Sequence, residues 1–272
     1  MNKLSDAQWQ RFQDAGYLRL GKLLSDDELR SLQLRINDIM LGKAELDYDN
    51  MLMQLDLAAT NYADIGAQTN GFKGATLDYR KIQDLELDPL FLTYLQQPVF
   101  RDICERAYGK GKPIACQRAM FMNKPAKRGS VLPWHQDRWD IFDRDPQITI
   151  WTALDPATLE NGCVHVIEAS HGRLINPDHP SGFLTEEQAA EAEKGAVIEV
   201  LVLEAGESVL LHNWLLHSSN VNKSENPRRA FSVCYMDGET RLVETGEQAT
   251  HLRRVFGENA LDPNQLASAQ AK

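Results

Sequence analysis

"AVIEVLVLEAGESVLLH", residues 196–212, is one of several apolar β-type runs in the second half of the chain. The others are "IACQRAMFMN" (114–123), "QITIWTALD" (147–155), "CVHVIEAS" (163–170) and "RRAFSVCYMDG" (228–238). Turns that contain proline, glycine and asparagine separate these runs. Several short strands at this spacing predict a β-sandwich or jelly roll that begins after residue 113.

The segments before residue 113 have a different pattern and are predicted to be mainly helical. Ser5 with Gln8, and Ser25 with Glu28, have capping-box spacing ahead of apolar residues at the helical period. A further helix, "DPLFLTYLQQPVFRDICERAYG", is expected to break near Pro98. Residues 42–80 are poorly periodic and are interpreted as a long surface loop, and "TEEQAAEAEKGA" (185–196) as a short inserted helix.

Together these segments predict a mainly β protein with flanking helices: a double-stranded β-helix (jelly-roll) core with an N-terminal helical layer. We expect one domain over residues 1–272, because no repeat, low-complexity tract or linker divides the chain. Within it, residues 1–112 form the mainly helical layer and a lid loop. Residues 113–238 form the jelly-roll core, and residues 239–272 form a C-terminal tail.

The composition is typical of a soluble globular protein, with 43% hydrophobic and 25% charged residues. A net charge of −10 argues against nucleic-acid binding, which needs concentrated lysine and arginine, although it permits a small anionic ligand. The four scattered cysteines favour reduced thiols. No signal peptide or membrane span is apparent, so we expect a cytoplasmic protein; its oligomeric state is not predicted.

"PWHQDRW", residues 133–139, places His135 and Asp137 two positions apart, so in a strand both side chains share one face. With 7 histidines and 39 acidic residues in the chain, one such triplet is expected by chance, and alone it decides nothing. A second histidine would complete the two-histidine, one-carboxylate set that binds Fe(II). His212 and His217 are both available, and His217 is better placed because the turn-type residues "SSN" follow it.

Arg228 lies 11 residues after His217, a distance that allows a turn and the start of a neighbouring strand. A guanidinium at that place could bind a carboxylate bidentately. Taken singly, each residue has a more ordinary interpretation. A histidine in an apolar strand is more often a hydrogen-bonded core residue, and an arginine is more often a surface charge.

The ordered set "MNKP…HQD…WTALD…ENGC…ASH…LLHSSNVNKS…RRA" resembles the phytanoyl-CoA dioxygenase family of Fe(II)- and 2-oxoglutarate-dependent oxygenases. The resemblance runs from about residue 72 to 236, with a weaker helical match before it. It implies an iron site formed by His135, Asp137 and His217. The chain has Ser218 where the family often has glycine, and "ASH" (169–171) in place of "GSH" or "GTH", differences that leave the ligands untouched.

The resemblance also implies a site for the cosubstrate 2-oxoglutarate. Its residues here would be Lys81, Met120, Trp151, Ser219 and Arg228. The implied reaction consumes O₂, hydroxylates a C–H bond of a small or medium metabolite, and releases succinate and CO₂. Cations at positions 81 and 228 would supply the partners that a dianion needs inside an acidic protein.

Two other functions compete with hydroxylation. A related halogenase would have a small residue in place of the carboxylate ligand, and the presence of Asp137 argues against that chemistry. A non-catalytic jelly-roll binding protein would have lost the ligands, all three of which remain. The substrate is a small molecule that the sequence does not identify. The charge of −10 and the lack of a basic cluster near the pocket make a coenzyme A thioester less attractive.

Residues that follow the first two ligands are expected to border the mouth of the site. Trp139 and either Arg138 or Arg118 are the predicted substrate contacts, and residues 66–74 are a hypothetical lid. His165, His171 and Trp134 have the residue types and positions of core or rim residues rather than of ligands.

Overall fold

The structure is a computed structural model that describes residues 2–56 and 67–270. Its α-helices are α1 (Asp6–Ala15), α2 (Asp26–Met40), α3 (Pro89–Leu95), α4 (Pro98–Tyr108), α5 (Glu186–Glu193) and α6 (Pro263–Gln270). Its strands are β1 (Tyr17–Lys22), β2 (Leu52–Leu55), β3 (Thr69–Asn70), β4 (Tyr79–Ile82), β5 (Ile114–Lys124), β6 (Leu132–His135), β7 (Ile148–Ala153), β8 (Val164–Ile167), β9 (Ile198–Leu201), β10 (Glu207–His212), β11 (His217–Ser219), β12 (Arg228–Asp237) and β13 (Arg253–Phe256).

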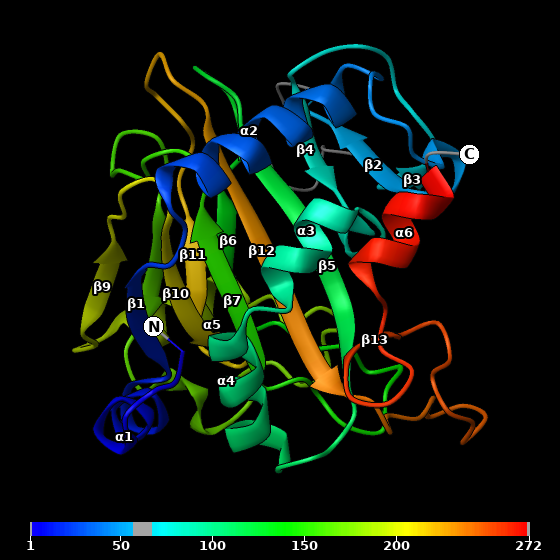
Figure 1. The fold of residues 1–272 in the computed structure, drawn as a ribbon. Coiled ribbons are helices and arrows are strands. Elements are labelled where there is room, and N and C mark those ends of the chain that lie inside the picture. The colour runs from blue at the N-terminus through cyan, green and yellow to red at the C-terminus, as the bar shows by residue number, and fades with distance from the viewer. Residues whose placement is uncertain (1, 57–66, 271–272) are drawn as a thin grey trace.

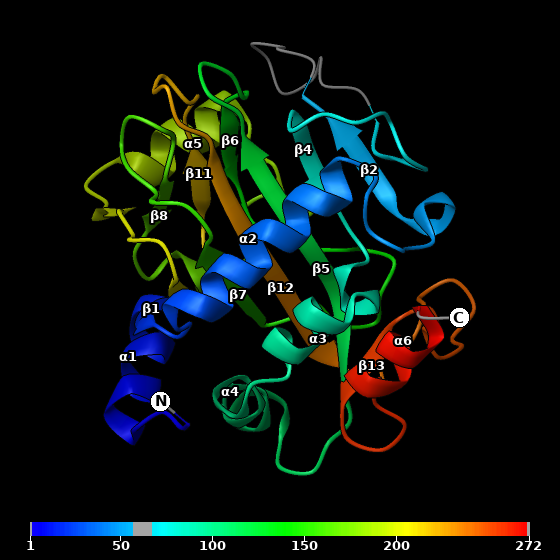
Figure 2. The same ribbon diagram turned by 45° about the horizontal axis from the view of Figure 1, so that its top comes forward.

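The strands form two antiparallel sheets. In the described residues the larger sheet has nine strands in the order β1-β10-β7-β12-β5-β4-β2-β3, with β13 paired to β5. The smaller sheet has four strands in the order β6-β11-β8-β9. Figures 1 and 2 show α2, α3 and α4 lying over the outer face of the larger sheet, in front of β5 and β12. The other face of the larger sheet looks toward the smaller one.

The N-terminal helices begin where the sequence predicts. Ser5 and Ser25 each accept a hydrogen bond from a backbone amide three residues later and complete a capping box. The third predicted helix is divided at Pro98, because proline fits the first turn of a new helix but has no amide hydrogen for the interior of an old one. The predicted helix near residue 185 is α5, which Thr185 caps.

Strand β12 contacts both the helical layer and the cavity, because its side chains alternate between the two faces of the larger sheet. Phe231, Val233 and Tyr235 point outward and pack with α2, α3 and α4 in the main hydrophobic core. Burial of such large side chains contributes about 1.5–3 kcal/mol each. Residues of the other parity, Ala230 and Ser232, face the smaller sheet. The strand therefore anchors the helical layer on one side and forms a wall of an internal cavity on the other.

Two stretches differ from the sequence-based expectation. The N-terminal part contains strands as well as helices: β1 pairs with β10, and β2, β3 and β4 fall within the stretch expected to be a surface loop. Residues 239–272, expected to be a tail, contain β13 and α6. These segments are short, and their partners lie far away in the sequence, so local periodicity did not reveal them.

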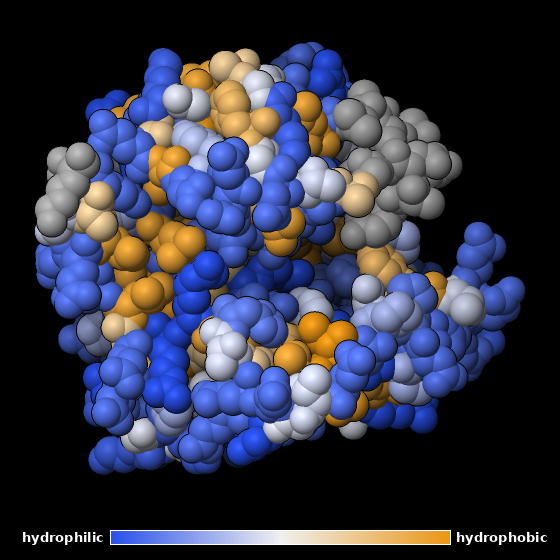
Figure 3. All heavy atoms as spheres, turned by 90° about the vertical axis from the view of Figure 1, so that its right-hand side faces the viewer, coloured by the Kyte–Doolittle hydropathy of each residue, from blue (hydrophilic) through white to orange (hydrophobic). Residues whose placement is uncertain are grey.

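The face of the molecule drawn in Figure 3 is mainly hydrophilic. On the face shown in Figure 3 apolar side chains appear as scattered groups among polar ones, as on most globular proteins. None of the helices in the described parts of the chain has both the length and the apolar character needed to cross a membrane.

Candidate functional site

The three predicted metal ligands lie together at the ends of two paired strands. His135 ends β6 and His217 begins β11, and the two residues are direct partners in the antiparallel register. Asp137 follows β6, with Oδ1 3.9 Å from His135 Nε2. One ligand atom from each residue can be chosen so that all three lie within 4.8 Å of one another. Antiparallel pairing thus brings together residues that are about eighty positions apart in the sequence.

Both imidazole rings are oriented by the backbone. His135 Nδ1 lies 2.9 Å from the Pro133 carbonyl oxygen, and His217 Nδ1 lies 2.9 Å from the Leu215 carbonyl oxygen. A carbonyl only accepts hydrogen bonds, so each Nδ1 must carry the hydrogen and donate it. Each Nε2 therefore keeps its lone pair for a cation, the arrangement that metal-binding histidines require. The donor set of two imidazole nitrogens and one carboxylate fits Fe(II).

The charge states also suit a divalent cation. Burial alone would raise the pKa of Asp137, but Arg118 and the two nearby histidines outweigh it and lower the pKa to about 2. Burial, followed by repulsion from His217, lowers the pKa of His135 to about 3. At neutral pH the carboxyl group is thus an anion and the His135 imidazole is neutral, as metal binding requires.

Three residues that the sequence analysis did not single out support this centre. Phe183 stacks on the His135 ring, with centroids 4.8 Å apart and planes at 15°. Gln136 is fully buried, and its amide nitrogen donates to the carbonyl oxygens of Arg173 and Trp214 at 2.8 and 2.6 Å. The Asn213 carbonyl accepts a hydrogen bond from Asp137 N at 2.8 Å. No local sequence signal marks Phe183 and Asn213, whereas Gln136 lies within the quoted HQD triplet but acts through contacts with distant segments.

The ligands open onto a cavity between the two sheets. All five residues predicted to bind 2-oxoglutarate line it, namely Lys81, Met120, Trp151, Ser219 and Arg228. Met120, Trp151 and Arg228 belong to the larger sheet, as does Lys81, whereas Ser219 lies on β11 beside the metal ligand His217. The strand register therefore places a cationic region next to the candidate metal centre.

Two cations in this cavity, the buried Arg228 and the half-buried Lys81, form no ion pair in the described part of the protein. Arg228 is only 3% exposed, its Nε has no hydrogen-bond partner, and its guanidinium lies 5.3 Å from the centre of the Trp151 ring. Burial, followed by repulsion from Arg80 and Arg118, lowers the pKa of Lys81 to about 7. Buried cations are usually paired. Arg228 departs from this rule, and Lys81 adds a second unpaired positive charge to the cavity.

Arg229, the neighbour of Arg228, points to the opposite face of β12. Its Nε and Nη2 donate to the two carboxylate oxygens of Asp155, both at 2.7 Å, and its Nη1 donates to Asn37 at 2.8 Å. This arginine therefore links the sheet to α2, and only Arg228 faces the cavity.

The predicted substrate residues lie at the cavity, but two of them have partners within the protein. Arg118 Nη2 lies 3.1 Å from Asp137 Oδ2, and the guanidinium covers the Trp139 ring. Arg138 donates to the Pro177 carbonyl oxygen. All three predicted substrate residues, Arg118, Arg138 and Trp139, line the cavity. Their contact with a substrate stays a prediction.

His212 lies outside the metal group. Its Nδ1 accepts a hydrogen bond from the Trp214 amide at 3.0 Å, and its ring centre is 5.0 Å from that of His171. Burial, followed by repulsion from His171, lowers the pKa of His212 to about 4. His171 in turn contacts the Gln13 carbonyl oxygen of α1 at 3.0 Å. Both rings therefore belong to the packing of α1 against the sheet.

Trp134 and His165, two of the residues expected to lie in the core or at the rim, pack within the protein. Trp134 is buried beside Ile167 and Leu216, and its Nε1 donates to Glu193 at 2.6 Å. His165 is partly buried on β8 and is not among the residues that line the cavity. Neither residue takes part in the candidate metal group.

The hypothetical lid has no support from the described residues. Residue 66 lies outside them, and none of residues 67–74 lines the cavity. β3 pairs with β2, and Gly71 N donates to the Met51 carbonyl oxygen at 3.1 Å. Lys73 N donates to the Tyr79 hydroxyl at 2.8 Å. This segment is fastened to the edge of the larger sheet instead of the mouth of the site.

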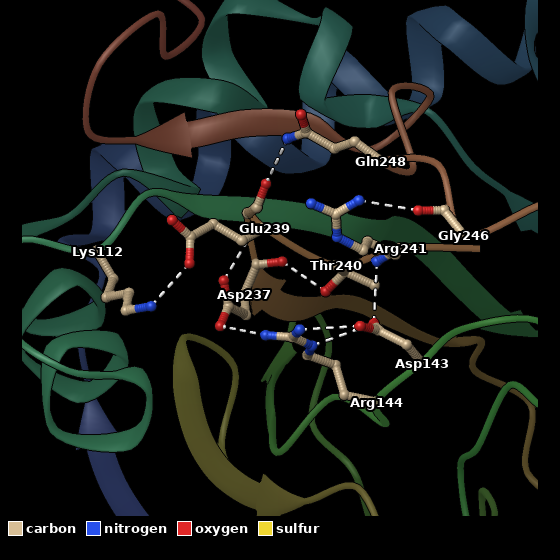
Figure 4. A network of polar contacts seen from close by, with 10 residues as sticks. Lys112, Asp143, Arg144, Asp237, Glu239, Thr240, Arg241, Gly246 and Gln248 are labelled. Atoms are coloured by element: carbon tan, nitrogen blue, oxygen red, sulfur yellow. Dashed lines mark hydrogen bonds and ion pairs between the residues drawn. The ribbon is translucent and has the colours of Figure 1, made fainter. Parts of the chain in front are cut away.

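The segment that follows Asp137 is fastened to the C-terminal part of the chain. Figure 4 shows Arg144 between Asp143 and Asp237, with the shortest contacts both 2.9 Å. The Arg241 amide donates to Asp143 at 2.9 Å. Beside this network Phe142 packs against Met236, with Trp139 at the edge of the cluster. Residues expected to be a tail thus support one wall of the cavity.

Comparison with known proteins gives a consistent result. The family model "Phytanoyl-CoA dioxygenase (PhyH)" matches residues 12–230, a longer stretch than the motifs alone indicated. A phytanoyl-CoA dioxygenase of Arabidopsis thaliana is 26% identical over 253 residues, covering 84% of this chain and 87% of that protein. The peroxisomal phytanoyl-CoA dioxygenase of Rattus norvegicus is 25% identical, covering 89% of this chain and 71% of that protein.

Solved structures agree on the fold. EctD from S. alaskensis, in a complex with 2-oxoglutarate and 5-hydroxyectoine, has a TM-score of 0.69 at 22% identity and covers 92% of this chain, with 84% of EctD matched. The α-ketoglutarate-dependent carbocyclase SnoK has a TM-score of 0.64 at 16% identity, covering 97% of this chain and 90% of SnoK. These likenesses confirm the predicted double-stranded β-helix. With a family match over most of its length and a His-Asp-His set at the expected place, the chain belongs to the phytanoyl-CoA dioxygenase family of Fe(II)- and 2-oxoglutarate-dependent oxygenases.

Proposed function

We propose that this protein hydroxylates a C–H bond of a small or medium-sized metabolite, using Fe(II), 2-oxoglutarate and O₂ and releasing succinate and CO₂. One observation carries the proposal. A complete metal-ligand set, with both Nε2 atoms free, opens onto the same cavity as Lys81 and Arg228, two cations that form no ion pair in the described chain. A binding protein that had lost catalysis would not need to keep the ligand set.

The residues divide into two groups with separate tasks. His135, Asp137 and His217 would hold the iron on one side and leave the other side open. When bound, the iron supplies the activation of O₂ for C–H oxidation. The imidazoles, each held by a backbone carbonyl, need no rearrangement before the metal enters.

The cationic group would select the cosubstrate. 2-Oxoglutarate has two carboxylates, and the chelating 2-oxo acid end must face the metal centre. Arg228 is then available for the distal carboxylate, with Ser219 as a hydroxyl donor and Trp151 beneath the guanidinium. Lys81 adds a second positive charge to the cavity.

We infer that the substrate is a free metabolite instead of a coenzyme A thioester. Several relatives are named for phytanoyl-CoA, whose coenzyme A moiety carries phosphates. Of the arginines predicted at the mouth here, Arg118 is bound to Asp137 and Arg138 to the Pro177 carbonyl. Neither is free to form the phosphate-binding cluster that a coenzyme A thioester would favour.

A metal titration with two histidine variants tests the proposal. The wild-type protein should bind one Fe(II) without oxygen and should form succinate when 2-oxoglutarate and O₂ are supplied. His217→Ala should lose both properties. His212→Ala should keep most of both, because His212 bonds to Trp214 and not to the metal group. Loss of iron in the His212 variant with retention in the His217 variant would reverse the assignment. A wild-type protein that binds no Fe(II) would refute the proposed function.

A further inference from the structure

The two oxygens of Asp137 have different surroundings. Oδ1 is the oxygen that lies 3.9 Å from His135 Nε2, on the side of the candidate metal centre. Oδ2 accepts a hydrogen bond from Arg118 Nη2 at 3.1 Å. Both side chains in this ion pair are only 17% exposed, so bulk water competes little with the contact. One carboxylate thus has a metal-facing oxygen and a protein-facing oxygen.

Arg118 is itself held in place from several sides. It lies on β5, where it is the register partner of Cys234 on β12, next to an irregularity in that pairing. Its guanidinium lies 5.1 Å from the centre of the Trp139 ring. The Trp139 amide donates to Asp145 at 3.2 Å. A cation held between a strand and a fixed aromatic ring has little freedom to leave Asp137.

We propose that Arg118 is a positioning residue of the metal site, which restricts Asp137 to a single metal-facing oxygen. The inference rests on the proposed function and adds a reason why Arg118 is paired with Asp137. Iron of this type has six coordination positions, of which the three ligands fill three if Asp137 binds through one oxygen. A chelating 2-oxo acid would need two more, which would leave one for O₂. A carboxylate bound through both oxygens would fill that last position.

The ion pair also bears on the sequence-based expectation that Arg118 contacts substrate. An arginine that recognised a substrate anion would have its donors directed into open space. Here Nη2 is bound to a metal-ligand residue, and Nε is buried without a hydrogen-bond partner. Arg138 lines the same cavity, but its guanidinium donates to the Pro177 carbonyl oxygen and not to Asp137. It therefore provides a matched control.

The test compares Arg118→Met, Arg118→Lys and Arg138→Met with the wild-type protein, without oxygen. Fe(II) alone is titrated first, and 2-oxoglutarate is then added to follow the visible absorption of its iron chelate. Arg118→Met should bind Fe(II) about 10- to 100-fold more weakly, the usual effect of removing a partner of a metal ligand. Arg118→Lys keeps one charged donor and should recover part of the affinity. Arg138→Met should match the wild-type protein in both titrations.

Other outcomes would overturn the inference. Equal Fe(II) affinity and equal chelate absorption in Arg118→Met and wild type would show that the ion pair does not position Asp137. Normal iron and 2-oxoglutarate binding with a loss only of substrate-dependent succinate would make Arg118 a substrate contact. If Arg118→Met does not fold, Arg118→Gln, which is shorter and uncharged but keeps an amide donor, decides by the same criteria. A wild-type protein without Fe(II) binding would instead refute the proposed function itself.

Discussion

Arg228 and Arg229 are neighbours in the sequence with opposite surroundings. Arg228 is buried in the cavity without a carboxylate partner in the described chain, whereas Arg229 has a two-point contact with Asp155. Replacing Arg228 with Met should weaken 2-oxoglutarate binding by about 2–5 kcal/mol, because a buried carboxylate loses its charged partner. The same change should raise the thermal midpoint of the ligand-free protein, since it removes an uncompensated buried charge. Calorimetric titration and thermal unfolding measure the two effects.

Arg229→Met is the matched control and should show the reverse pattern. It breaks the bridge from Asp155 to Asn37 on α2 and should lower the thermal midpoint, with little effect on 2-oxoglutarate binding. If Arg229→Met, and not Arg228→Met, weakened the binding of the diacid, the assignment of the cosubstrate site would be wrong.

Lys81 should make cosubstrate binding depend on pH. Its pKa of about 7 means that the ammonium group is mostly charged below pH 7 and mostly neutral above it. A dianion binds the charged form, so the affinity for 2-oxoglutarate should fall as pH rises above 7, by at most about tenfold per pH unit. Lys81→Arg, which stays charged, should bind without this decline. A decline of equal slope in both proteins would assign the titration to another group.

At this scale the sequence predicted the residues that carry chemistry and missed those that support them. The spacing of His135 and Asp137 made them candidates only, and the ordered motifs of the family resemblance selected them together with His217. Phe183 and Asn213 carry no such signal, because their roles arise from contacts with segments that fold back from elsewhere. The contact of Arg118 with Asp137 likewise has no local signal, because β5 belongs to the larger sheet and Asp137 follows β6 of the smaller one.

At the scale of elements, the conformation of the segment 173–184 depends on one glycine, Gly182. Gly182 has a φ of +65°, and a Cβ there would collide with the Gln136 carbonyl oxygen. Gly182→Ala should displace the segment and its neighbour Phe183, which stacks on His135. We expect a loss of about 1–3 kcal/mol of stability and weaker Fe(II) binding, measured by chemical unfolding and metal titration.

Gly195→Ala is the control, because it carries the energetic cost of a positive φ without a steric clash. Gly195 has a φ of +67°, but a Cβ added to it would have no atom within 4 Å. This variant should lose only about 1–2 kcal/mol and should bind Fe(II) like the wild-type protein. Equal iron affinity in the two glycine variants would contradict a role for the close approach at Gly182.

Elements with strong local signals were predictable, whereas short ones were not. α1 and α2 are specified by capping boxes and an apolar stripe, and β5, β7 and β12 by long apolar runs. β6 and β11 have only four and three residues, and their pairing is irregular between His217 and Ser219. Such strands acquire their conformation from their neighbours, so the two elements that hold the candidate ligands had the weakest signals of their own.

At the scale of the whole molecule, β13 is joined to the body through a buried acid. Arg253 Nη1 lies 2.8 Å from Glu86 and 3.4 Å from Asp84. Burial raises the pKa of Glu86 to about 7, although Arg253 opposes the shift. The folded protein therefore holds this proton more tightly than the unfolded chain does. The associated stability is present below pH 4.5 and is lost as pH rises through 7.

Glu86→Gln should therefore raise the thermal midpoint above that of the wild-type protein at about pH 8, where the wild-type carboxyl must ionise in a buried place. The difference should shrink at about pH 5. Glu239→Gln is the control, because Glu239 is exposed and its contact is with Lys112 at the surface. A midpoint difference for Glu86→Gln that is independent of pH would rule out ionisation as its cause.

The overall architecture was predictable because the strand runs occur in the order of a jelly roll, and only its outer parts were not. The extra strands β1 and β13 attach to the core by pairing across long stretches of sequence. α6 lies beside α3 in Figure 1, where Leu266 packs against the main core. Contacts of this kind form between segments far apart in the sequence once the core has assembled, so the local pattern of residues does not predict them.

His135 and His217 are direct partners in the strand register. A metal ion bound by both would therefore link the two strands in addition to its role in the reaction. An ion held by both rings would staple β6 to β11, two short strands of the smaller sheet, at the end where the ligands lie. Loading with a redox-inert ion such as Zn²⁺ should then slow amide hydrogen exchange at residues 132–135 and 217–219 more than elsewhere. Without metal this link between the strands would be absent, and the strand edges would be exposed to proteases. The supply of iron would then govern the lifetime of the protein as well as its turnover.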